Sequence, residues 1–295
     1  MDKTTWLEER QKGIGGSDAA AVCGMSPWKS AYQVYQEKIG TIVPQEDNPA
    51  MFWGRTLEPV IRQRYADVTG KTVTVPKGIL THPTRNFMLA NLDGIIPNDR
   101  VVEIKTARSD KDWGEEGSNE IPDPYMLQIQ HYLIITALPV ADVAVLFHGQ
   151  DFRIYEVPED KELQELMVDK EAVFWDMVQR QLPPDPVTFS DIKQKWGGIS
   201  KSIELQATPE ITKMVEQLHG LKDLKKKEDE LKARIMAFMQ EADTLIHPIN
   251  QKPLVTWKLG SPIKRLDITS LKSEQTDIYN QFLKEGIPSR RFLIK

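Results

Sequence analysis

One short stretch, "LDGIIPNDRVVEIKTA" from residue 92 to residue 107, constrains the fold of this chain most strongly. Its second half, residues 101–107, has the β-branched and apolar content of a buried strand, interrupted by Glu103 and Lys105. Side chains alternate between the two faces of a strand, so the acid and the base share one face. The other face carries Val102, Ile104 and Thr106. The pattern predicts a core strand with a charged pair on one side.

A second acid, Asp93, ends the preceding apolar run, just before Gly94. If the two runs pair across "IIPNDR", Asp93 approaches Glu103, and two buried carboxylates repel each other unless a cation joins them. Mg²⁺ prefers oxygen ligands and could polarise a phosphoryl oxygen or activate a water molecule. Lys105 could orient or deprotonate that water, or offset phosphate charge. The residues alone leave a second interpretation open, a Glu–Lys pair on the exposed face of an edge strand.

The hydrophobic period changes twice before the proline-rich segment "LPPDP". Helical patterns come first, and Ser17 or Asp18 is expected to cap the earliest of them. Strands are then expected at 71–75, 87–96 and 101–107, followed by a buried helix at 123–138. Two further strands, at 142–149 and 151–157, precede an amphipathic helix at 159–181. This order predicts an α/β domain with a mixed central sheet flanked by helices.

The C-terminal third has a different pattern. We expect a domain at 1–190, a linker at 191–207, and an extension at 208–295 made of a long helix, a strand and a short helix. Thr208 is a suitable cap for the long helix. Its apolar positions form a heptad-like line that falters, and a second line with sevenfold spacing: Leu224, Leu231 and Phe238. The helix either packs on its own tail or forms a self-associating coiled coil.

Composition bounds the function classes. The 295 residues are 40% hydrophobic and 27% charged, which is typical of a soluble globular protein. No apolar run approaches the roughly 18 residues of a membrane helix, and residues 1–13 lack an apolar signal-peptide core, so we expect no membrane association. The single cysteine, Cys23, excludes an internal disulfide framework and a four-cysteine cluster, and it suits a reducing cytoplasm. The net charge of −5 argues against a protein that coats nucleic acid, although a local basic groove remains compatible with it.

The charged stretch resembles a known nuclease signature. Asp93, Glu103 and Lys105 match the PD-(D/E)XK motif, with Leu92 in the place that its name gives to proline. The resemblance implies a restriction-endonuclease-like core within the expected α/β fold.

Three further motifs resemble one branch of that superfamily, the phage lambda exonuclease and YqaJ viral recombinase family. The segment "YMLQIQHYL" resembles its glutamine-containing helix, with Gln128 as the motif glutamine and Tyr125 and Gln130 also matching. Upstream, "GIGGSDAAAVCGMSPW" and "WGRTLEP" resemble its N-terminal glycine–serine motif and its Gly-x-x-x-Glu helix, which contributes Glu58. The motifs follow the family's order over roughly residues 6–157.

The family resemblance implies a role for each matched residue. It places Mg²⁺, with Mn²⁺ as a substitute, on Asp93, Glu103, the Ile104 carbonyl and Glu58. It makes Lys105 and Gln128 the groups that position the attacking water. It assigns a 5′-terminal phosphate to Arg10 and Ser17. Each has an ordinary alternative: Ser17 as a helix cap, Glu58 as a solvated acid, and Gln128 as a buried amide with a structural partner.

The implied activity is a phage-type exonuclease. Such an enzyme digests linear double-stranded DNA from a 5′ end and leaves a 3′ strand for a phage single-strand annealing protein. The family also implies a ring-shaped homo-oligomer, often a trimer, and the cytoplasm of a bacterial host that carries the phage or prophage. Two alternatives stay open: a structure-specific or restriction-type endonuclease on the same core, and a non-catalytic DNA-end-binding protein.

Several residues outside the motifs also carry expectations. His131 is expected to be a packing histidine, and Trp28 and Trp53 to be core residues, with an aromatic wedge at a DNA end as the alternative. The C-terminal basic residues either hold the DNA backbone or form a solvated surface: Lys258, Lys264, Arg265, Arg290 and Arg291.

Overall fold

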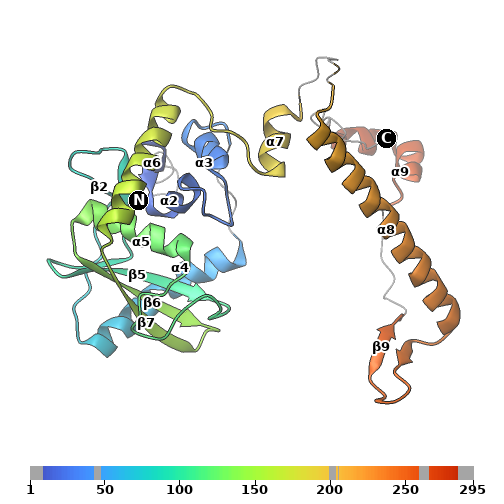
Figure 1. Cartoon of the computed structure of the whole chain (residues 1–295), viewed down its shortest axis with the longest axis horizontal. Helices are drawn as coiled ribbons and strands as arrows, with labels where there is room; N and C mark the ends of the chain where they lie inside the picture. The colour runs from blue at the N-terminus through green and yellow to red at the C-terminus, as the bar shows by residue number, and fades with distance from the viewer. Residues whose placement is uncertain (1–8, 43–47, 199–203, 205, 259–265, 285–295) are drawn as a thin grey trace. The chain divides into compact units, whose positions relative to one another are not determined.

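The computed structural model describes residues 9–42, 48–198, 204, 206–258 and 266–284. The chain divides into two compact units, Met1–Lys195 and Trp196–Lys295 (Figure 1). Among the described residues, no helix combines the length and the apolar character that a membrane crossing requires.

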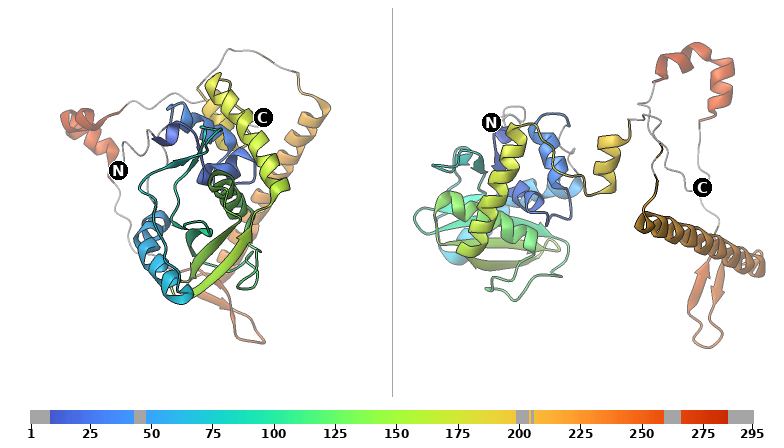
Figure 2. Two further views of the ribbon diagram at one scale, coloured as in Figure 1. Left: turned by 90° about the vertical axis from the view of Figure 1, so that its left-hand side faces the viewer. Right: turned by 45° about the horizontal axis from the view of Figure 1, so that its top comes forward.

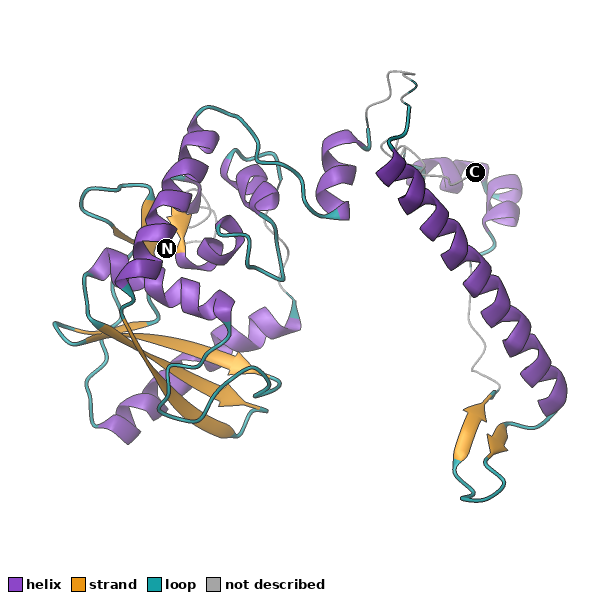
Figure 3. Cartoon of the chain, in the orientation of Figure 1, coloured by secondary structure: helices purple, strands orange, loops and turns teal. Residues whose placement is uncertain are grey.

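The first unit is organised around a four-stranded mixed sheet, drawn in orange in Figure 3. Its strands follow the order β4-β5-β6-β7, with bounds Gly94–Ile96, Arg100–Ala107, Val140–Phe147 and Asp151–Pro158. β5 and β6 are parallel, whereas β4 and β7 are antiparallel to their neighbours. A smaller sheet has the order β1-β3-β2, with bounds Ile14–Gly15, Met88–Ala90 and Leu80–Thr81. The expected mixed central sheet is therefore confirmed.

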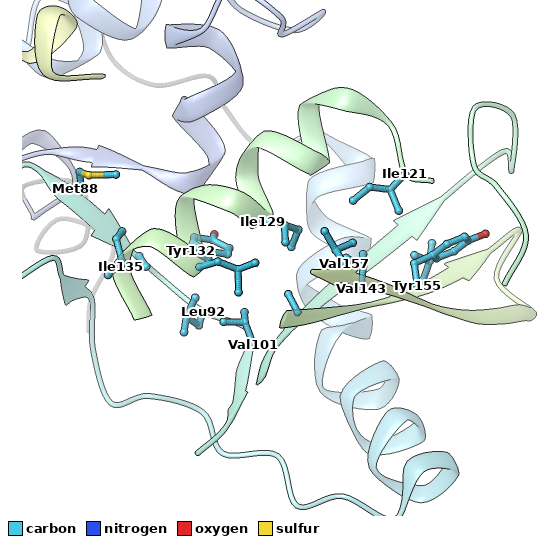
Figure 4. Packing of buried hydrophobic residues seen from close by; sticks show 14 of the residues in the cluster. Met88, Leu92, Val101, Ile121, Ile129, Tyr132, Ile135, Val143, Tyr155 and Val157 are labelled. Atoms are coloured by element: carbon cyan, nitrogen blue, oxygen red, sulfur yellow. The ribbon is translucent and has the colours of Figure 1, made fainter. Parts of the chain in front are cut away.

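Helices cover both faces of the four-stranded sheet (Figures 1 and 2). On one face, α5 (Asp123–Thr136) buries Ile129 and Leu133 against the strands, as Figure 4 shows for Ile129 beside Val143 and Val157. On the other face, α4 (Pro49–Thr69) buries Ile61 and Tyr65. Each such side chain stabilises the fold by roughly 1.5–3 kcal/mol through the apolar area removed from water. The remaining helices of this unit are α2 (Gly16–Val22), α3 (Ala31–Lys38), α6 (Lys161–Gln179) and α7 (Phe189–Trp196).

The alternation of side chains along β5 decides which residues face which helix. Val101 packs in the cluster that includes α5, whereas Val102 and Ile104 pack in the cluster that includes α4. Glu103 and Lys105 have the parity of Val101, so they point toward α5. The predicted separation of the charged pair from its apolar neighbours is confirmed.

Several predicted element boundaries are wrong. The run at 87–96 is not one strand, because the chain leaves the small sheet after Ala90 and enters the main sheet at Gly94. Residues 71–75 form only an isolated bridge between Thr74 and Ile95 among the described residues. The first helix has Gly15 rather than Ser17 or Asp18 at its cap position. The next helix starts at Ala31, where the Ser30 hydroxyl accepts a hydrogen bond from the Gln33 amide at 3.1 Å.

The first unit extends to Lys195, past the expected boundary at residue 190, because α7 is held to the rest of the unit. The buried Asp191 carboxylate accepts a hydrogen bond from the Ser30 hydroxyl at 2.9 Å. It also accepts hydrogen bonds from the backbone amides of Val187 and Thr188. Asp191 thus fixes the start of α7 and joins it to the start of α3.

The second unit contains α8 (Pro209–Met239), the hairpin β8–β9 (Thr244–Ile246 and Pro253–Thr256), α9 (Ile268–Glu274) and α10 (Thr276–Phe282). Thr208 caps α8 as predicted, by accepting a hydrogen bond from the Ile211 amide. Within α8, Met239 is the only buried residue, and Leu224 and Phe238 are 63% and 75% exposed. Packing of α8 on its own tail is therefore not found in the described part of the chain, and the coiled coil stays a prediction.

We predict that Gly16→Ala destabilises the first unit. A Cβ at Gly16 would lie 2.3 Å from Cε1 of Tyr132, a fully packed side chain of α5. The overlap outweighs the helix preference of alanine and lowers the free energy of unfolding by about 1–3 kcal/mol, measured by urea denaturation. Gly78→Ala is the control, because its Cβ would enter open space. Equal stabilities for the two variants would contradict this packing argument.

Candidate active site

The break between the two sheets places Asp93 beside β5. Asp93 directly precedes β4, whose first residue, Gly94, pairs with Val102. The Ile104 amide donates a hydrogen bond to Asp93 Oδ2 at 2.9 Å, which fixes the carboxylate against the strand. A Cβ at Gly94 would lie 2.5 Å from Val73 Cγ1, so glycine is required where the chain passes residue 73. The pairing of the two runs, predicted across "IIPNDR", is confirmed.

Gln128 of α5 joins the charged pair of β5. Its amide nitrogen donates to Glu103 Oε1 at 2.8 Å, and its amide oxygen accepts from Lys105 Nζ at 2.9 Å. Lys105 Nζ also binds Glu103 Oε1, at 2.7 Å. The structure therefore brings together the acid, the base and the amide that the sequence motif lists, and it excludes the exposed edge-strand interpretation, because β5 is an inner strand and Glu103 is 2% exposed.

The two acids are costly to ionise together. Burial and the charge of Asp93 raise the pKa of Glu103 to about 8. Burial also raises the pKa of Asp93, although the charge of Lys105 and the Ile104 amide act in the opposite direction. The second oxygen of Glu103, Oε2, is buried without a hydrogen-bond partner. Such an atom is rare in a folded protein, and either a proton shared with Asp93 or a bound cation would give it a partner.

Because Glu103 Oε2 has no hydrogen-bond partner, Glu103 and Asp93 fit a divalent cation. The unpartnered Glu103 Oε2 and the nearby carboxylate of Asp93 are hard oxygen donors of the kind that Mg²⁺ and Mn²⁺ accept. Within the described ranges, no three acid, histidine or cysteine side chains form a ready-made metal group. A cation here would therefore need further oxygen ligands besides the two acids, such as water or a backbone carbonyl.

Lys105 keeps its proton in this setting. Burial lowers its pKa, but the charges of Glu103 and Asp93 outweigh burial, and the net result is a raised pKa. Lys105 Nζ also lies 5.0 Å from the centroid of the Tyr125 ring, within cation–π range. The ammonium is therefore a fixed positive charge and hydrogen-bond donor rather than a free base.

Glu58 reaches the edge of the same site from α4. Its carboxylate binds Arg62 at 3.2 Å, and Arg62 donates to the backbone carbonyl of Asp93 at 2.5 Å. Burial and the charge of Asp93 raise the pKa of Glu58. Glu58 is thus near Asp93, and Arg62, which the sequence analysis did not single out, holds the two together.

Arg10, which precedes β1, reaches Ser17 of α2, so the two residues to which the family resemblance assigned a phosphate are in contact. The Arg10 guanidinium donates to the Ser17 hydroxyl at 3.0 Å and to Asp18 Oδ1 at 3.1 Å. Ser17 is exposed, whereas Asp18 is completely buried. Ser17 is not the helix cap, so its hydroxyl is available on the surface beside a cation.

Asp18 is the anchor of a cationic cluster that sequence reasoning missed. Besides Arg10, it binds Lys29 and Lys38, each at 2.8 Å. Burial alone would raise the pKa of Asp18, but the charges of Lys38, Arg10 and Lys29 hold it well below its usual range. Three cations thus surround this one carboxylate, and Lys29 also binds Glu37.

Tyr132 lies between the acids and the cationic cluster. Gln128 donates to its hydroxyl at 3.0 Å, and the hydroxyl donates to the Asn91 carbonyl at 3.2 Å. The ring packs against Gly16 at the start of α2. The sequence analysis did not single out Tyr132. Its spacing predicts the contact with Gln128, because it follows that residue by one helical turn.

The other motif residues of α5 have structural roles. Gln130 binds the Pro158 carbonyl and the Asp160 amide, which ties α5 to the end of β7. His131 is fully buried between Glu171 and the Leu89 carbonyl, as a packing histidine should be. The expectation that Trp28 and Trp53 belong to the core is wrong, because they are 66% and 55% exposed.

We predict a pH-dependent stability difference between the wild type and Glu103→Gln in buffer without divalent ions. The folded pKa of Glu103, about 8, is raised above its ordinary value of 4.5. Its stabilising contribution is complete below the ordinary value and is lost as the pH rises through the folded value. Glutamine mimics the protonated acid, so the two proteins should unfold alike near about pH 5. The variant should be more stable by on the order of 3 kcal/mol near about pH 9.

Chemical denaturation at several pH values measures this difference. Glu165→Gln, an exposed acid on α6, is the matched control and should follow the wild type. A stability difference between Glu103→Gln and the wild type that stays constant with pH would show that ionising Glu103 does not lower the free energy of unfolding.

Comparison with known proteins agrees with this arrangement. Residues 5–139 match the YqaJ-like viral recombinase domain. The uncharacterised protein YqaJ of Bacillus subtilis (strain 168) is 31% identical over 313 residues, which cover 100% of this chain and 95% of that protein.

Solved structures share the fold. The alkaline exonuclease LHK-Exo of Laribacter hongkongensis has a TM-score of 0.52 at 21% identity, over 65% of this chain and 97% of that chain. A second structure of LHK-Exo, in complex with dAMP, has a TM-score of 0.51 at 19% identity, over the same shares of the two chains. A putative exonuclease of Eubacterium rectale has a TM-score of 0.50 at 15% identity, over 69% and 96%. The predicted PD-(D/E)XK-type fold is thereby confirmed, and the chain belongs to the YqaJ-like viral recombinase family.

Proposed function

We propose that this protein is a metal-dependent deoxyribonuclease that digests linear double-stranded DNA from a 5′ end. One observation carries the proposal: the buried Glu103, bound to Lys105 and Gln128, has an unpartnered oxygen beside Asp93. An acid pair of this kind has no value for packing, since a buried ion pair contributes little net stability. It suits a site that holds a cation against a phosphodiester.

The roles of the side chains follow from their contacts. Asp93 and Glu103, with the Ile104 carbonyl and Glu58 as further candidates, would hold a divalent cation, which would supply Lewis acidity toward the scissile phosphate. Lys105 donates hydrogen bonds from a fixed position, so it orients the attacking water and offsets phosphate charge. Its raised pKa favours this role over proton abstraction. Gln128 holds both Glu103 and Lys105 in place and is a second candidate for positioning the water.

The second cluster is the proposed seat of the 5′-terminal phosphate. Arg10 and the exposed Ser17 hydroxyl are adjacent. Asp18 lies beside them and also binds Lys29 and Lys38. A guanidinium next to a hydroxyl is a suitable phosphate contact. Tyr132 lies between this cluster and the acids, so a terminal phosphate and a scissile phosphate of one strand would flank it.

The similar structures are consistent with an exonuclease. Two of them are named exonucleases, and one was solved with dAMP. At 15–21% identity they support the fold, and the reaction of this chain is proposed from its own residues. A structure-specific or restriction-type endonuclease on the same core is the alternative enzyme. A non-catalytic DNA-end-binding protein is disfavoured, because the acid, base and amide are all present and in contact.

The biological setting is proposed from the family. Membership in a viral recombinase family suggests a phage or prophage protein in the bacterial cytoplasm, acting with a single-strand annealing protein. A ring-shaped oligomer, such as a trimer, remains a proposal. Of the C-terminal basic residues, Lys258 is exposed and is a candidate contact to the DNA backbone, and the other four lie outside the described residues.

We predict that Lys105→Ala lowers the rate of nucleotide release from 5′-phosphorylated linear duplex in Mg²⁺ by at least about 100-fold. The variant loses the donor that faces both Glu103 and the water. Lys161→Ala, at an exposed lysine of α6, is the matched control and should keep the wild-type rate.

Covalently closed circular DNA in the same assay separates the two enzyme proposals. The exonuclease leaves it intact, whereas cleavage of the circle would favour the endonuclease. Mg²⁺-independent binding without nucleotide release by the wild type would eliminate both.

A further inference from the structure

A pocket of about 420 Å³ opens at the C-terminal end of β5, next to the proposed active site. Its volume lies in the range of roughly 300–1,000 Å³ that is usual for small-molecule sites. Its lining includes Thr106 of β5 and Arg108, just after the strand, together with the aromatic residues Trp28, Trp113 and Tyr125. None of these five residues has a part in the reaction proposed above.

The aromatic wall is an ordered stack. Trp28 and Tyr125 have ring centroids 5.7 Å apart and an interplanar angle of 29°. Trp113 lies 5.6 Å from Tyr125 and is fixed from behind by Phe147, at 5.4 Å, and by Tyr155, at 4.9 Å. Trp113 and Tyr125 thus rest on the core, and Trp28 is the outermost ring.

Trp28 is exposed although hydrogen bonds hold its stretch of chain. Its backbone amide and that of Lys29 both donate to the Ser26 hydroxyl, at 3.2 and 3.3 Å. The Lys29 side chain is tied to Asp18. The tryptophan is therefore held between a turn and the cationic cluster while 66% of it stays in contact with solvent. A rigid aromatic ring with an open surface is a platform for stacking.

The pocket shares a wall with the catalytic groups. Lys105 Nζ lies 5.0 Å from the centroid of the Tyr125 ring, and Thr106 is the next residue of β5. At the pocket, Arg108 is exposed, and none of the described residues pairs with its guanidinium. A group bound in the pocket would therefore lie within one nucleotide's reach of the phosphate at Lys105, with a free cation nearby for the next phosphate.

We propose that this pocket binds an unstacked nucleobase of the strand being cleaved, next to the scissile phosphate, with Trp28 as the main stacking surface. The proposal rests on the function proposed above. A base offers a flat ring to Trp28 and polar edges to the hydroxyls of Thr106 and Ser109 and the carboxylate of Asp112, which also line the pocket. Stacking accepts any base, which suits an enzyme that must pass along DNA of every sequence.

The test compares DNA that has a base at the proposed position with DNA that lacks it. Duplexes with a 5′-phosphate carry an abasic residue at the first, second or third nucleotide of the cleaved strand. Binding is measured in EDTA, where no cleavage follows. For the wild type, one of the three positions should weaken binding by about 5-fold to about 100-fold, the range expected for loss of one base–aromatic stack.

Trp28→Ala should remove that difference, so that intact and abasic duplexes bind it equally. Trp28→Phe keeps an aromatic surface and should retain part of the difference, which shows that folding is preserved. Trp257→Ala is the matched control, since Trp257 is an exposed tryptophan of the second unit, and it should behave like the wild type. A wild-type difference that persists in Trp28→Ala, or no difference at any of the three positions, would overturn the proposal.

The assay also separates this inference from the proposed function. Wild-type nucleotide release in Mg²⁺ with equal binding of all duplexes would leave the nuclease standing and remove the base pocket. A base-dependent affinity that requires Trp28, without nucleotide release, would keep the pocket and remove the nuclease. With both correct, Trp28→Ala should raise KM more than it lowers kcat, because the catalytic groups remain in place.

Discussion

The buried carboxylate of Glu103 is the constraint on which the rest of the site depends. One of its oxygens takes hydrogen bonds from Lys105 and Gln128, and the other has no partner. Ionising this acid beside Asp93 is unfavourable, so the protein holds an electrostatic strain that a cation would relieve. The surrounding fold keeps the strain in place, because β5 is an inner strand that α4 and α5 cover on both faces. In the proposed function, this cost in stability serves the binding of a cation.

Asp18 is a second buried carboxylate, and its surroundings favour its ionised form, whereas those of Glu103 oppose ionisation. Asp18 has cations on both oxygens, so its ionised form is strongly favoured. It arranges Arg10, Lys29 and Lys38 on one side of Tyr132, while Asp93 and Glu103 lie on the other. In the proposed function, the cationic cluster would bind one phosphate of a DNA strand and the acidic pair would hold a metal ion at the next. The close packing of Tyr132 on Gly16 couples them sterically.

The sequence predicted the parts of this structure that depend on local pattern. Alternation along residues 101–107 placed Glu103 and Lys105 on one face, and the family motif indicated Gln128, on a buried helix, as part of the same site. It missed what depends on tertiary partners. Asp18 resembles an ordinary helix-cap residue until Lys29 and Lys38 fold onto it. Trp28 was expected in the core because tryptophan is usually buried, but its ring stacks on Tyr125 and stays exposed. The apolar run at 87–96 gave no sign that the chain changes sheets within it.

Cation binding by the metal-free protein tests the central claim most directly. Calorimetric titration with Mn²⁺ should show binding to the wild type and to Glu165→Gln, whose substituted acid lies on α6, remote from β5 in the chain. Asp93→Asn and Glu103→Gln should each bind at least about tenfold more weakly, because each removes one negatively charged oxygen donor. Equal affinity for all four proteins would contradict the account, since it would place the cation elsewhere than between Asp93 and Glu103.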